Sequence, residues 1–509
     1  MAKKEETRGY GESYIPEGNG KRYSSSRAFA KGLDLRCQGD TMTMSACKNI
    51  DVKKLPEIAS VEKSSRIQTN AAAGFELKGF YGYDDKLFYI LESGTTVKLV
   101  RTGGGDIAVT EWTLDEEEAE NISGKNREMA VFCWYNPTGT VPDEDGKVEL
   151  FYDMTPTYYL IVAPDRRYIP INFGNAATPE KDDVSPIFDH ITVWNSRLFG
   201  ARDSVVVCSS AGTFKDWTCD TPEGSDAAGL TLGGYDATHA WYSTTQANTQ
   251  STGDITAITA YDGHPIIFKD DYMHQINNNK NPFRIQDIVA VGCVSARSVC
   301  ELDGVLYFAS RDGIYRYGGG YPSCISEPLN CSEYSSDVVC GAYDGVLYVY
   351  NPNISKTLIY TYCPENGLWA AIENPHDGDD IIAFATNDLG VHSIDADGTV
   401  YRLPKDDGSE DHADWFATSD RMFFGSAGDK RLHSLEVVAM GENVGFCIVR
   451  DGDDNPPING KKTLSGVDTV RYLIRKTDSV YNKLRLSGDG EIKVFRADLV
   501  YSYSGQRYR

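Results

Sequence analysis

Tight turns that recur at a fixed interval are the feature that most limits the fold of this chain. The stretches AYDGHPIIF, ELDGVLYF and AYDGVLYVY place an apolar or aromatic residue before an Asp-Gly pair and a strand-like run after it. Their aspartates, Asp262, Asp303 and Asp344, are 41 residues apart, and a similar turn follows at Asp388. Glycine accepts the positive φ that such hairpin turns require. A period of about 40 residues made of short strands and turns predicts the four-stranded blades of a β-propeller.

Earlier parts of the chain carry turns of the same kind. They are followed by strand-like runs and lie at Asp85, Gly146 and Asn195. In each repeat another strand-like run precedes the turn, and we expect it to be the inner strand of a blade. The turns together predict seven blades between residues 66 and 408.

The stretch WNSRLFGARDSVVVCSSAGTFKDW, residues 194–217, illustrates one predicted blade. It contains a middle hairpin, then a loop of small residues, then FKDW at the start of the outer edge. We expect Trp217 to pack between adjacent blades, and Trp112 and Trp369 to do the same, because large aromatic side chains fill such interfaces. Residues 219–252 are rich in glycine and predict a long insertion between blades.

The two ends of the chain differ from the repeats. Residues 1–27 are polar and predict an extended assembly arm, which orders on a partner. Residues 28–65 contain short strand-like pieces, one of which is expected to return and close the propeller. Residues 409–509 alternate apolar and polar side chains in longer runs and predict an antiparallel β-sandwich. The predicted fold class is therefore all-β.

Charge excludes some function classes. The formal net charge is −24 and the sequence pI is about 4.8. Proteins that bind nucleic acids neutralise phosphates with Lys and Arg, so this balance argues against sequence-specific nucleic-acid binding. An acidic balance suits a passage through which DNA slides without adhering, but an ordinary solvated surface is the simpler explanation.

The cysteines and the apolar runs indicate the cellular compartment in which the protein is made. The 12 Cys include no C-x-x-C pair, and several lie among apolar neighbours, as in VVVCSS and GFCIV. This favours buried, reduced thiols and synthesis in a reducing cytoplasm. No signal peptide is apparent and no apolar run approaches the roughly 18 residues of a membrane helix, so no membrane span is expected.

Acidic clusters and histidines are the candidates for chemistry. The clusters DEDG (143–146), DADG (395–398) and DGDD (451–454) lack the spaced ligand set of a Ca²⁺ loop, and hairpin turns explain them, although Ca²⁺ binding stays open. The stretch 209–217 faintly resembles the Asp-box turn of sialidases, but Ala211 replaces the aspartate. The eight His form no metal or hydrolase motif. No catalytic, cofactor-binding or metal-binding residue is assigned, no cofactor is expected, and the chain is predicted not to be an enzyme.

Three stretches resemble β-propeller structural proteins of tailed bacteriophages and prophages. The first, KGLDLRCQGDTMTMSACKNIDV, matches their opening pattern at Gly32 and Asn49. The second is the blade stretch ITVWNSRLFGARDSVVVCSSAGTFKDW, which matches at Arg197, Leu198, Phe199, Ser209 and Trp217. The third is the C-terminal alternation that ends EIKVFRADLVYSYSGQ.

The resemblance implies a tail, neck, hub or nozzle component of a virion. It would assemble as a homo-oligomeric ring with other tail or head-tail connector proteins, through the 1–27 arm, the 219–252 insertion and the sandwich. Two alternatives remain open at this point. A receptor- or carbohydrate-binding propeller predicts exposed aromatic residues such as Tyr272 or Tyr321. A propeller glycosidase, which the sequence favours less, predicts a carboxylate-lined central pocket.

Overall fold

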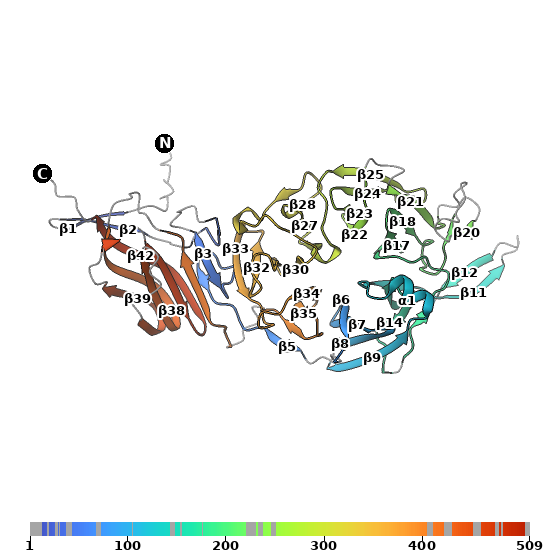
Figure 1. Ribbon diagram of the computed structural model, residues 1–509, viewed down its shortest axis with the longest axis horizontal. Helices are drawn as coiled ribbons and strands as arrows, with labels where there is room; N and C mark the ends of the chain where they lie inside the picture. Colours follow the sequence, from blue (N-terminus) through green and yellow to red (C-terminus); the bar gives the residue numbers. More distant parts are fainter. Residues whose placement is uncertain are drawn as a thin grey trace.

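The structure is a computed structural model, and it divides into a ring of sheets and a second β-structure beside it (Figure 1). The residues that it describes are 13–17, 20–25, 29, 31–36, 43–67, 73–103, 105–142, 148–152, 155–175, 177–219, 231–232, 238–245, 251–404, 411–421, 430–450, 460–473, 478–479 and 482–503. Almost all regular structure is β, and the α-helix among these residues is α1, Glu116–Ile122.

The ring consists, in the described residues, of seven four-stranded antiparallel sheets, numbered here in chain order. The first three are β6 Glu76–Tyr83, β7 Lys86–Ser93, β8 Thr96–Gly103 and β9 Asp106–Thr113; β10 Glu128–Trp134, β13 Thr157–Ala163, β14 Arg167–Pro170 and β15 Glu180–Lys181; β16 His190–Trp194, β17 Arg197–Arg202, β18 Val205–Cys208 and β21 Trp241–Thr244. The next two are β22 Ile255–Tyr261, β23 His264–Lys269, β24 Met273–Asn277 and β25 Arg284–Val289; β26 Cys300–Leu302, β27 Val305–Ser310, β28 Gly313–Tyr317 and β29 Ser323–Cys324. The last two are β30 Val339–Tyr343, β31 Val346–Tyr350, β32 Leu358–Cys363 and β33 Leu368–Glu373; β34 Ile381–Asn387, β35 Gly390–Asp395, β36 Val400–Arg402 and β5 Ser65–Ile67.

The first strand of each sheet lies toward the ring centre, as the labels β6, β22, β30 and β34 show (Figure 1). Neighbouring first strands contact one another around most of the ring, and the short 3-10 helix η2, Ala296–Ser298, contacts both β22 and β30. A circle of four-stranded antiparallel sheets, each running outward from the centre, is the architecture of a β-propeller.

The ring closes where the first and seventh sheets meet. A Cβ on Gly82 would lie 2.2 Å from the carbonyl oxygen of Thr386, so only glycine permits this backbone approach. The Asp388 amide donates to the Asp84 carbonyl at 2.9 Å. The seventh sheet takes its fourth strand, β5, from the N-terminal segment, where it pairs with β36. The closing strand therefore comes from the opposite end of the repeats.

Large aromatic side chains fill the spaces between sheets. Trp217 is buried among side chains of the second and third sheets, and its ring centre lies 5.3 Å from that of Phe188. Trp112 is buried between the first and second sheets. Trp369 is buried in the core cluster that contains the side chains of the sixth sheet, and its indole N–H donates to the Ile325 carbonyl. Packing of Trp217 and Trp112 between sheets is thereby confirmed.

Two predicted pieces of the ring are placed differently. The hairpin turn at Gly146 lies outside the described residues, but its flanking strands, β11 Pro137–Pro142 and β12 Val148–Tyr152, form a separate two-stranded sheet. The second sheet instead pairs β10 with β13. FKDW is not the outer strand of the third sheet, because β21 occupies that position. A turn sequence predicts a hairpin, but it does not tell which sheet the hairpin joins.

The predicted 219–252 insertion accordingly contains β21 as well as loop residues. Two-residue strands β19 Thr218–Cys219 and β20 Thr231–Leu232 pair in parallel beside it. Residues 220–230, 233–237 and 246–250 lie outside the described part of the chain.

The second β-structure, called the β-domain below, is one hydrogen-bonded sheet of ten strands. They are β1 Ser13–Glu17, β2 Gly20–Ser25, β3 Met44–Lys48, β4 Ile58–Ala59, β37 Trp415–Ser419, β38 Lys430–Arg450, β39 Gly460–Leu473, β40 Asp478–Ser479, β41 Asn482–Gly488 and β42 Ile492–Tyr503. The long strand β38 pairs with β42 through its first half and with β41 through its second half. It changes partners near Gly441, which has a φ of 128° and register shifts on both sides.

The N-terminal segment belongs to the β-domain as well as to the ring. β2 pairs with β42 and β3 pairs with β37, so the described part of residues 1–27 is a hairpin in the sheet rather than an extended arm. Residues 1–12, 18–19 and 26–28 lie outside the described residues. The boundary predicted at residue 409 also changes, because these N-terminal strands complete the sheet of residues 409–509. Pairing with β42 satisfies the backbone hydrogen-bonding groups of β2. The polar composition of residues 1–27 does not reveal this pairing.

Candidate functional site

The seam between the ring and the β-domain is held by residues 31–36 and 43–67. Asn49 accepts a hydrogen bond from the Glu373 amide of β33 at 2.7 Å and donates to the Asp414 carbonyl at 2.7 Å. The Leu33 amide donates to the Trp369 carbonyl at 2.8 Å, and a Cβ on Gly32 would lie 2.8 Å from that same oxygen. The outer strand of the sixth sheet is therefore covered and hydrogen-bonded rather than left as an open edge.

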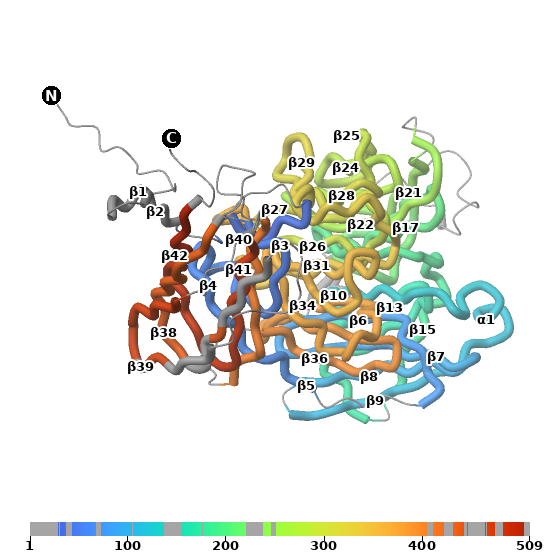
Figure 2. The backbone as a smooth tube through the Cα atoms, turned by 60° about the vertical axis from the view of Figure 1, so that its left-hand side comes forward, coloured from blue at the N-terminus to red at the C-terminus, as the bar shows by residue number. Residues whose placement is uncertain are grey.

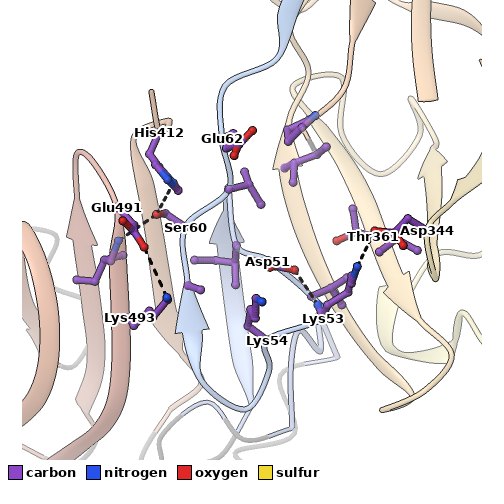
Figure 3. Close-up of a pocket in the computed structure, with 18 of the residues that line it drawn as sticks. Asp51, Lys53, Lys54, Ser60, Glu62, Asp344, Thr361, His412, Glu491 and Lys493 are labelled. Atoms are coloured by element: carbon purple, nitrogen blue, oxygen red, sulfur yellow. Dashed lines mark hydrogen bonds and ion pairs between the residues drawn. The ribbon is translucent and has the colours of Figure 1, made fainter. Parts of the chain in front are cut away.

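A cavity of about 640 Å³ lies along this seam (Figure 3). Its floor is apolar and includes Val52, Val346, Tyr348 and Ile372. Its rim carries charges of both signs, from Asp51, Lys53, Lys54, Glu62, Asp344, Glu491 and Lys493. A cavity of this size with a few polar groups has the dimensions of a small-ligand site.

Two ion pairs neutralise four of the rim charges. Lys53 of the N-terminal segment lies 2.8 Å from Asp344, in the first turn of the sixth sheet, and Lys493 of β42 lies 3.6 Å from Glu491. Lys53 and Asp344 are both more than a third exposed, so solvent screens their interaction. The Lys53–Asp344 pair joins the two walls, and the rim as a whole mixes carboxylates with lysines rather than presenting one sign of charge.

Ser60 and His412 form the one serine–histidine contact in this cavity. The Ser60 hydroxyl lies 3.0 Å from His412 Nδ1 and 3.1 Å from the Gly490 carbonyl, and it accepts from the Ile492 amide at 3.2 Å. Within the described residues no carboxylate contacts His412. A nucleophilic serine needs a base that a third group orients. The arrangement joins strands of the β-domain, and it is suited to holding the wall rather than to acyl transfer.

The Thr361 hydroxyl is a polar atom on the ring side of the same cavity. Thr361 is 3% exposed, and in the described part of the structure its Oγ1 has no hydrogen-bond partner. Figure 3 places it beside Asp344, on the wall formed by the sixth sheet. A buried hydroxyl without a partner costs stability unless water or another molecule supplies a hydrogen bond.

The ring centre is the second place where polar side chains from several sheets meet. Arg297 of η2 donates to the Ile382 carbonyl of the seventh sheet at 3.2 Å and to the side-chain oxygen of Asn126 before the second sheet. Because it reaches first-strand positions of two other sheets, its guanidinium bridges the centre. Burial lowers the pKa of Arg297, although the Glu128 carboxylate acts in the opposite direction.

Carboxylates at the ring centre are ion-paired. Glu128 lies 2.6 Å from His190 Nδ1 and accepts from the Ile191 amide at 3.0 Å. Burial opposes protonation of His190, but Glu128 outweighs it and raises the pKa of this histidine. Asp189 lies 3.0 Å from Lys125. These two carboxylates, which the glycosidase alternative could use, each lie against a basic side chain.

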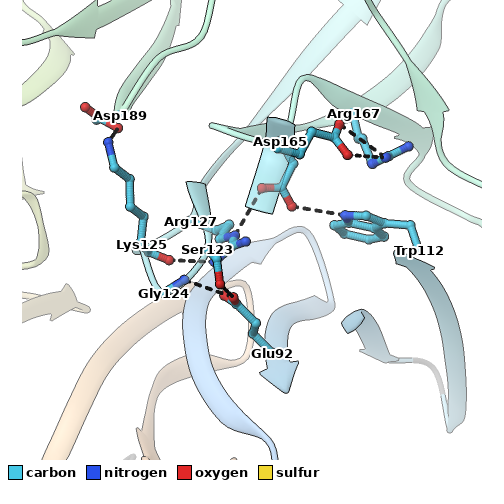
Figure 4. A network of polar contacts seen from close by, with 10 residues as sticks. Glu92, Trp112, Ser123, Gly124, Lys125, Arg127, Asp165, Arg167 and Asp189 are labelled. Atoms are coloured by element: carbon cyan, nitrogen blue, oxygen red, sulfur yellow. Dashed lines mark hydrogen bonds and ion pairs between the residues drawn. The ribbon is translucent and has the colours of Figure 1, made fainter. Parts of the chain in front are cut away.

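A buried ion network joins the first two sheets (Figure 4). The Arg127 side chain is fully buried and contacts two buried carboxylates, Glu92 of β7 and Asp165 at the turn between β13 and β14, the latter at 3.1 Å. Trp112 donates its indole N–H to Asp165 at 3.2 Å. Burial raises the pKa of Asp165 despite the two arginines beside it. The network fixes the first sheet on the second, and solvent does not reach it.

Two Ser–His–Asp arrangements occur among the described residues of the ring, and in both the serine and the histidine are buried. In the seventh sheet His376 lies 2.9 Å from the Ser393 hydroxyl and 3.1 Å from Asp395, and Ser393 is 0% exposed. Burial opposes ionisation of Asp395, but hydrogen bonds from His376 and the Thr399 amide outweigh it and lower its pKa.

The fourth sheet carries the second arrangement. His274 lies 3.0 Å from the Ser251 hydroxyl and 2.7 Å from Asp287. Burial lowers the pKa of His274 although Asp287 favours its protonated form. A serine that no substrate can reach does not act as a nucleophile, so both arrangements hold loops against the sheets. Sequence reasoning missed them because no motif links residues of these spacings.

The structure explains the residues that carry the phage resemblance. Arg197 is buried and donates to the carbonyls of Ser209 and His239 at 2.7 and 2.8 Å, and the Leu198 amide donates to the Ser209 hydroxyl. With Gly32, Asn49 and Trp217 described above, these residues all fix loops, seams or sheet interfaces.

Other predicted features fall at separate places. Asp395 of the 395–398 cluster holds its own turn, and the clusters 143–146 and 451–454 both lie outside the described residues. No group of three metal-binding side chains occurs among the described residues. Tyr321 is 87% exposed, while Tyr272 is half-buried and stacks on His274. Burial raises the pKa of the Cys208 thiol to about 12. The described helices include none with the length and apolarity that a bilayer crossing requires.

Comparisons with known proteins give no family. No protein-family model matches the chain, and no curated protein matches it. Among solved structures, a chain described as the extracellular domain of a hybrid two-component system from B. thetaiotaomicron is similar with a TM-score of 0.39 and 8% identity, covering 87% of this chain and 61% of that one. The WD40 domain of Toxoplasma gondii coronin is similar with a TM-score of 0.36 and 10% identity, covering 74% of this chain and 90% of that one. At these scores neither similarity assigns a function.

Proposed function

We propose that this chain is a non-enzymatic structural protein of a tailed phage particle, located in the tail, neck or hub. In this proposal the seven four-stranded sheets are the blades of a seven-bladed propeller, and the ten-stranded sheet folds about β38 as a sandwich. One observation carries it: the residues shared with phage propeller proteins, from Gly32 and Asn49 to Arg197 and Trp217, occupy architectural positions. A resemblance confined to architectural residues supports a structural role.

The acidic ring and the covered seam fit the same proposal. Asn49 and the residues around it attach the β-domain to the ring, so that the chain forms one body with a large surface for neighbours. The proposed partners are further copies of the chain and adjacent tail or head-tail connector proteins. The chain is then made in the bacterial cytoplasm and incorporated into the virion.

Purified tailed particles from the strain that encodes the chain provide the test. We expect mass spectrometry to find the chain in a fixed ratio to other tail proteins, and gold-labelled antibody to mark the tail or neck in negative stain. Absence from intact particles, or labelling that washes away with salt, would refute the proposal.

A receptor- or glycan-binding role is the second candidate, and the exposure of Tyr321 favours it. Aromatic rings exposed to solvent stack on sugar faces, and Tyr321 projects from the β28–β29 connection. A glycan array with the full chain and with Tyr321→Ala tests this role. Binding that is lost in the variant establishes it, whereas absence of binding leaves the structural role as the better account.

A further inference from the structure

The outer edge of β39 is the longest strand edge in the described structure that no other strand pairs with. β39 pairs with β38 on one side and has no strand on the other within the described residues. Both views show it at the end of the β-domain that points away from the ring (Figures 1 and 2). An unpaired strand of this length offers backbone donors and acceptors to another strand.

Exposed apolar side chains mark the second half of this strand. Val467 is 63% exposed and Leu473 is 80% exposed, whereas Val470 between them is buried. Side chains alternate along a strand, so Val467 and Leu473 share the outward face and Val470 faces the core. Exposed aliphatic residues on an open edge are unusual in a monomer, since natural edges normally carry charges or proline there.

Their spacing is symmetric about Val470. A two-fold axis that is perpendicular to the sheet and lies midway between the Val470 residues of two copies pairs β39 with a second β39 in antiparallel fashion. In this register Val467 of each copy lies directly opposite Leu473 of the other. Directly opposite side chains are the pairs that stabilise a sheet. We propose that two copies of the chain associate through β39 in this register, continuing the β-domain sheet from one copy into the next.

Charge supports a second copy at this end of the molecule. Residues 409–509 contain as many Lys and Arg as Asp and Glu, so the formal net charge of −24 arises from residues 1–408. Two acidic rings repel each other, while two β-domains do not. Arg471 is the charged residue nearest the axis on the outward face, and Glu436 lies 3.1 Å from it, so the two arginines do not oppose pairing.

Light scattering on the full chain gives the first test. We expect the mass to rise from 56.2 kDa toward twice that value with concentration. Val467→Lys with Leu473→Lys should raise the dissociation constant of the dimer at least about tenfold. The variant replaces the apolar side chains of both Val467–Leu473 pairs that lie opposite each other across the interface. Both side chains are exposed, so folding is retained. Val184→Lys with Tyr321→Lys, at exposed ring positions, is the control and should leave the dimer unchanged.

A cross-linking experiment tests the register. Val467→Cys with Leu473→Cys should give disulfide-linked dimers under mild oxidation, while Val467→Cys with Thr469→Cys, on the same face in the wrong register, should not. A chain that stays monomeric at concentrations on the order of 1 mM overturns the proposal. So does a dimer that the lysine pair leaves intact, or equal cross-linking in both cysteine pairs. The virion assignment is tested on particles and this surface on the purified chain, so the two can fail separately.

Discussion

The ring and the β-domain are both antiparallel β-structures, but they are assembled from different parts of the chain. In the ring, each sheet except the seventh is built from one continuous stretch of sequence. In the β-domain, β2 pairs with β42 and β3 pairs with β37, across almost the whole chain. Local pairing leaves a repeat in the sequence, while long-range pairing leaves none. Substitutions that act on only one of the two parts test this difference.

The largest expected effect is on the ring. Arg127→Met removes the cation from two buried carboxylates, Glu92 and Asp165. We expect the free energy of unfolding of the ring to fall by about 3–5 kcal/mol, because the two carboxylates remain buried without the arginine charge that balances them. Urea unfolding followed by tryptophan fluorescence measures it. Lys125→Met, which breaks a half-exposed ion pair with Asp189, is the control and should cost less than about 1 kcal/mol.

The matching substitution in the β-domain is Gly441→Ala. Gly441 has a φ of 128°, and a Cβ there would lie 2.3 Å from the Glu491 carbonyl oxygen. We expect a loss of about 2–4 kcal/mol in the β-domain alone, since β38 cannot change partners without this bend. Hydrogen exchange should show faster exchange in β38 and β42 and unchanged exchange in the ring. Gly466→Ala, where an added Cβ meets nothing within 4 Å, should have little effect.

The same difference between local and long-range pairing explains which parts of the fold could be predicted from the sequence. Turn residues such as Asn195 and Asp262 adopt the positive φ that hairpins need, so the inner hairpins of the ring could be located from the sequence. β21 could not, because the insertion before it hides its place in the third sheet. The seam could not either, because Asn49 contacts Glu373 and Asp414, which no local pattern connects to it. The buried Ser–His–Asp sets were missed for the same reason.

The third prediction concerns pH and the closure of the ring. His392 is 0% exposed, and neither ring nitrogen has a hydrogen-bond partner in the described structure. Burial, together with nearby Arg402, lowers its pKa from 6.5 to about 4. The unfolded chain therefore binds a proton below about pH 6.5 that the folded chain does not bind until about pH 4. Stability contributed by the neutral histidine is complete above pH 6.5 and is lost as the pH falls toward 4, by up to about 3 kcal/mol.

Unfolding by urea at pH 7.0 and pH 4.5 measures this effect. We expect His392→Leu to be at least as stable as the parent at pH 7.0 and to lose much less stability at pH 4.5. His264→Gln, in a half-buried histidine of the fourth sheet, serves as the control and should keep the parent's pH dependence. An equal loss in His392→Leu and the parent would mean that other groups govern the acid sensitivity.

The smallest effect on stability, and the sharpest test of how the two parts are joined, is expected at Asn49. Asn49→Ala removes both side-chain hydrogen bonds of the seam and places alanine at a φ of 57°. We expect a cost of about 1–3 kcal/mol and a single unfolding transition that separates into two, one for each part. In Asn49→Gly the residue adopts the positive φ without strain, but both side-chain hydrogen bonds are lost. Asn49→Asp keeps only the bond from the Glu373 amide. If the two hydrogen bonds of the Asn49 side chain couple the ring to the β-domain, calorimetry should show two transitions for the glycine variant and an intermediate separation for the aspartate variant. If backbone strain alone matters, the glycine variant should behave like the parent, and the seam would then be held by the buried apolar contacts that the two parts share.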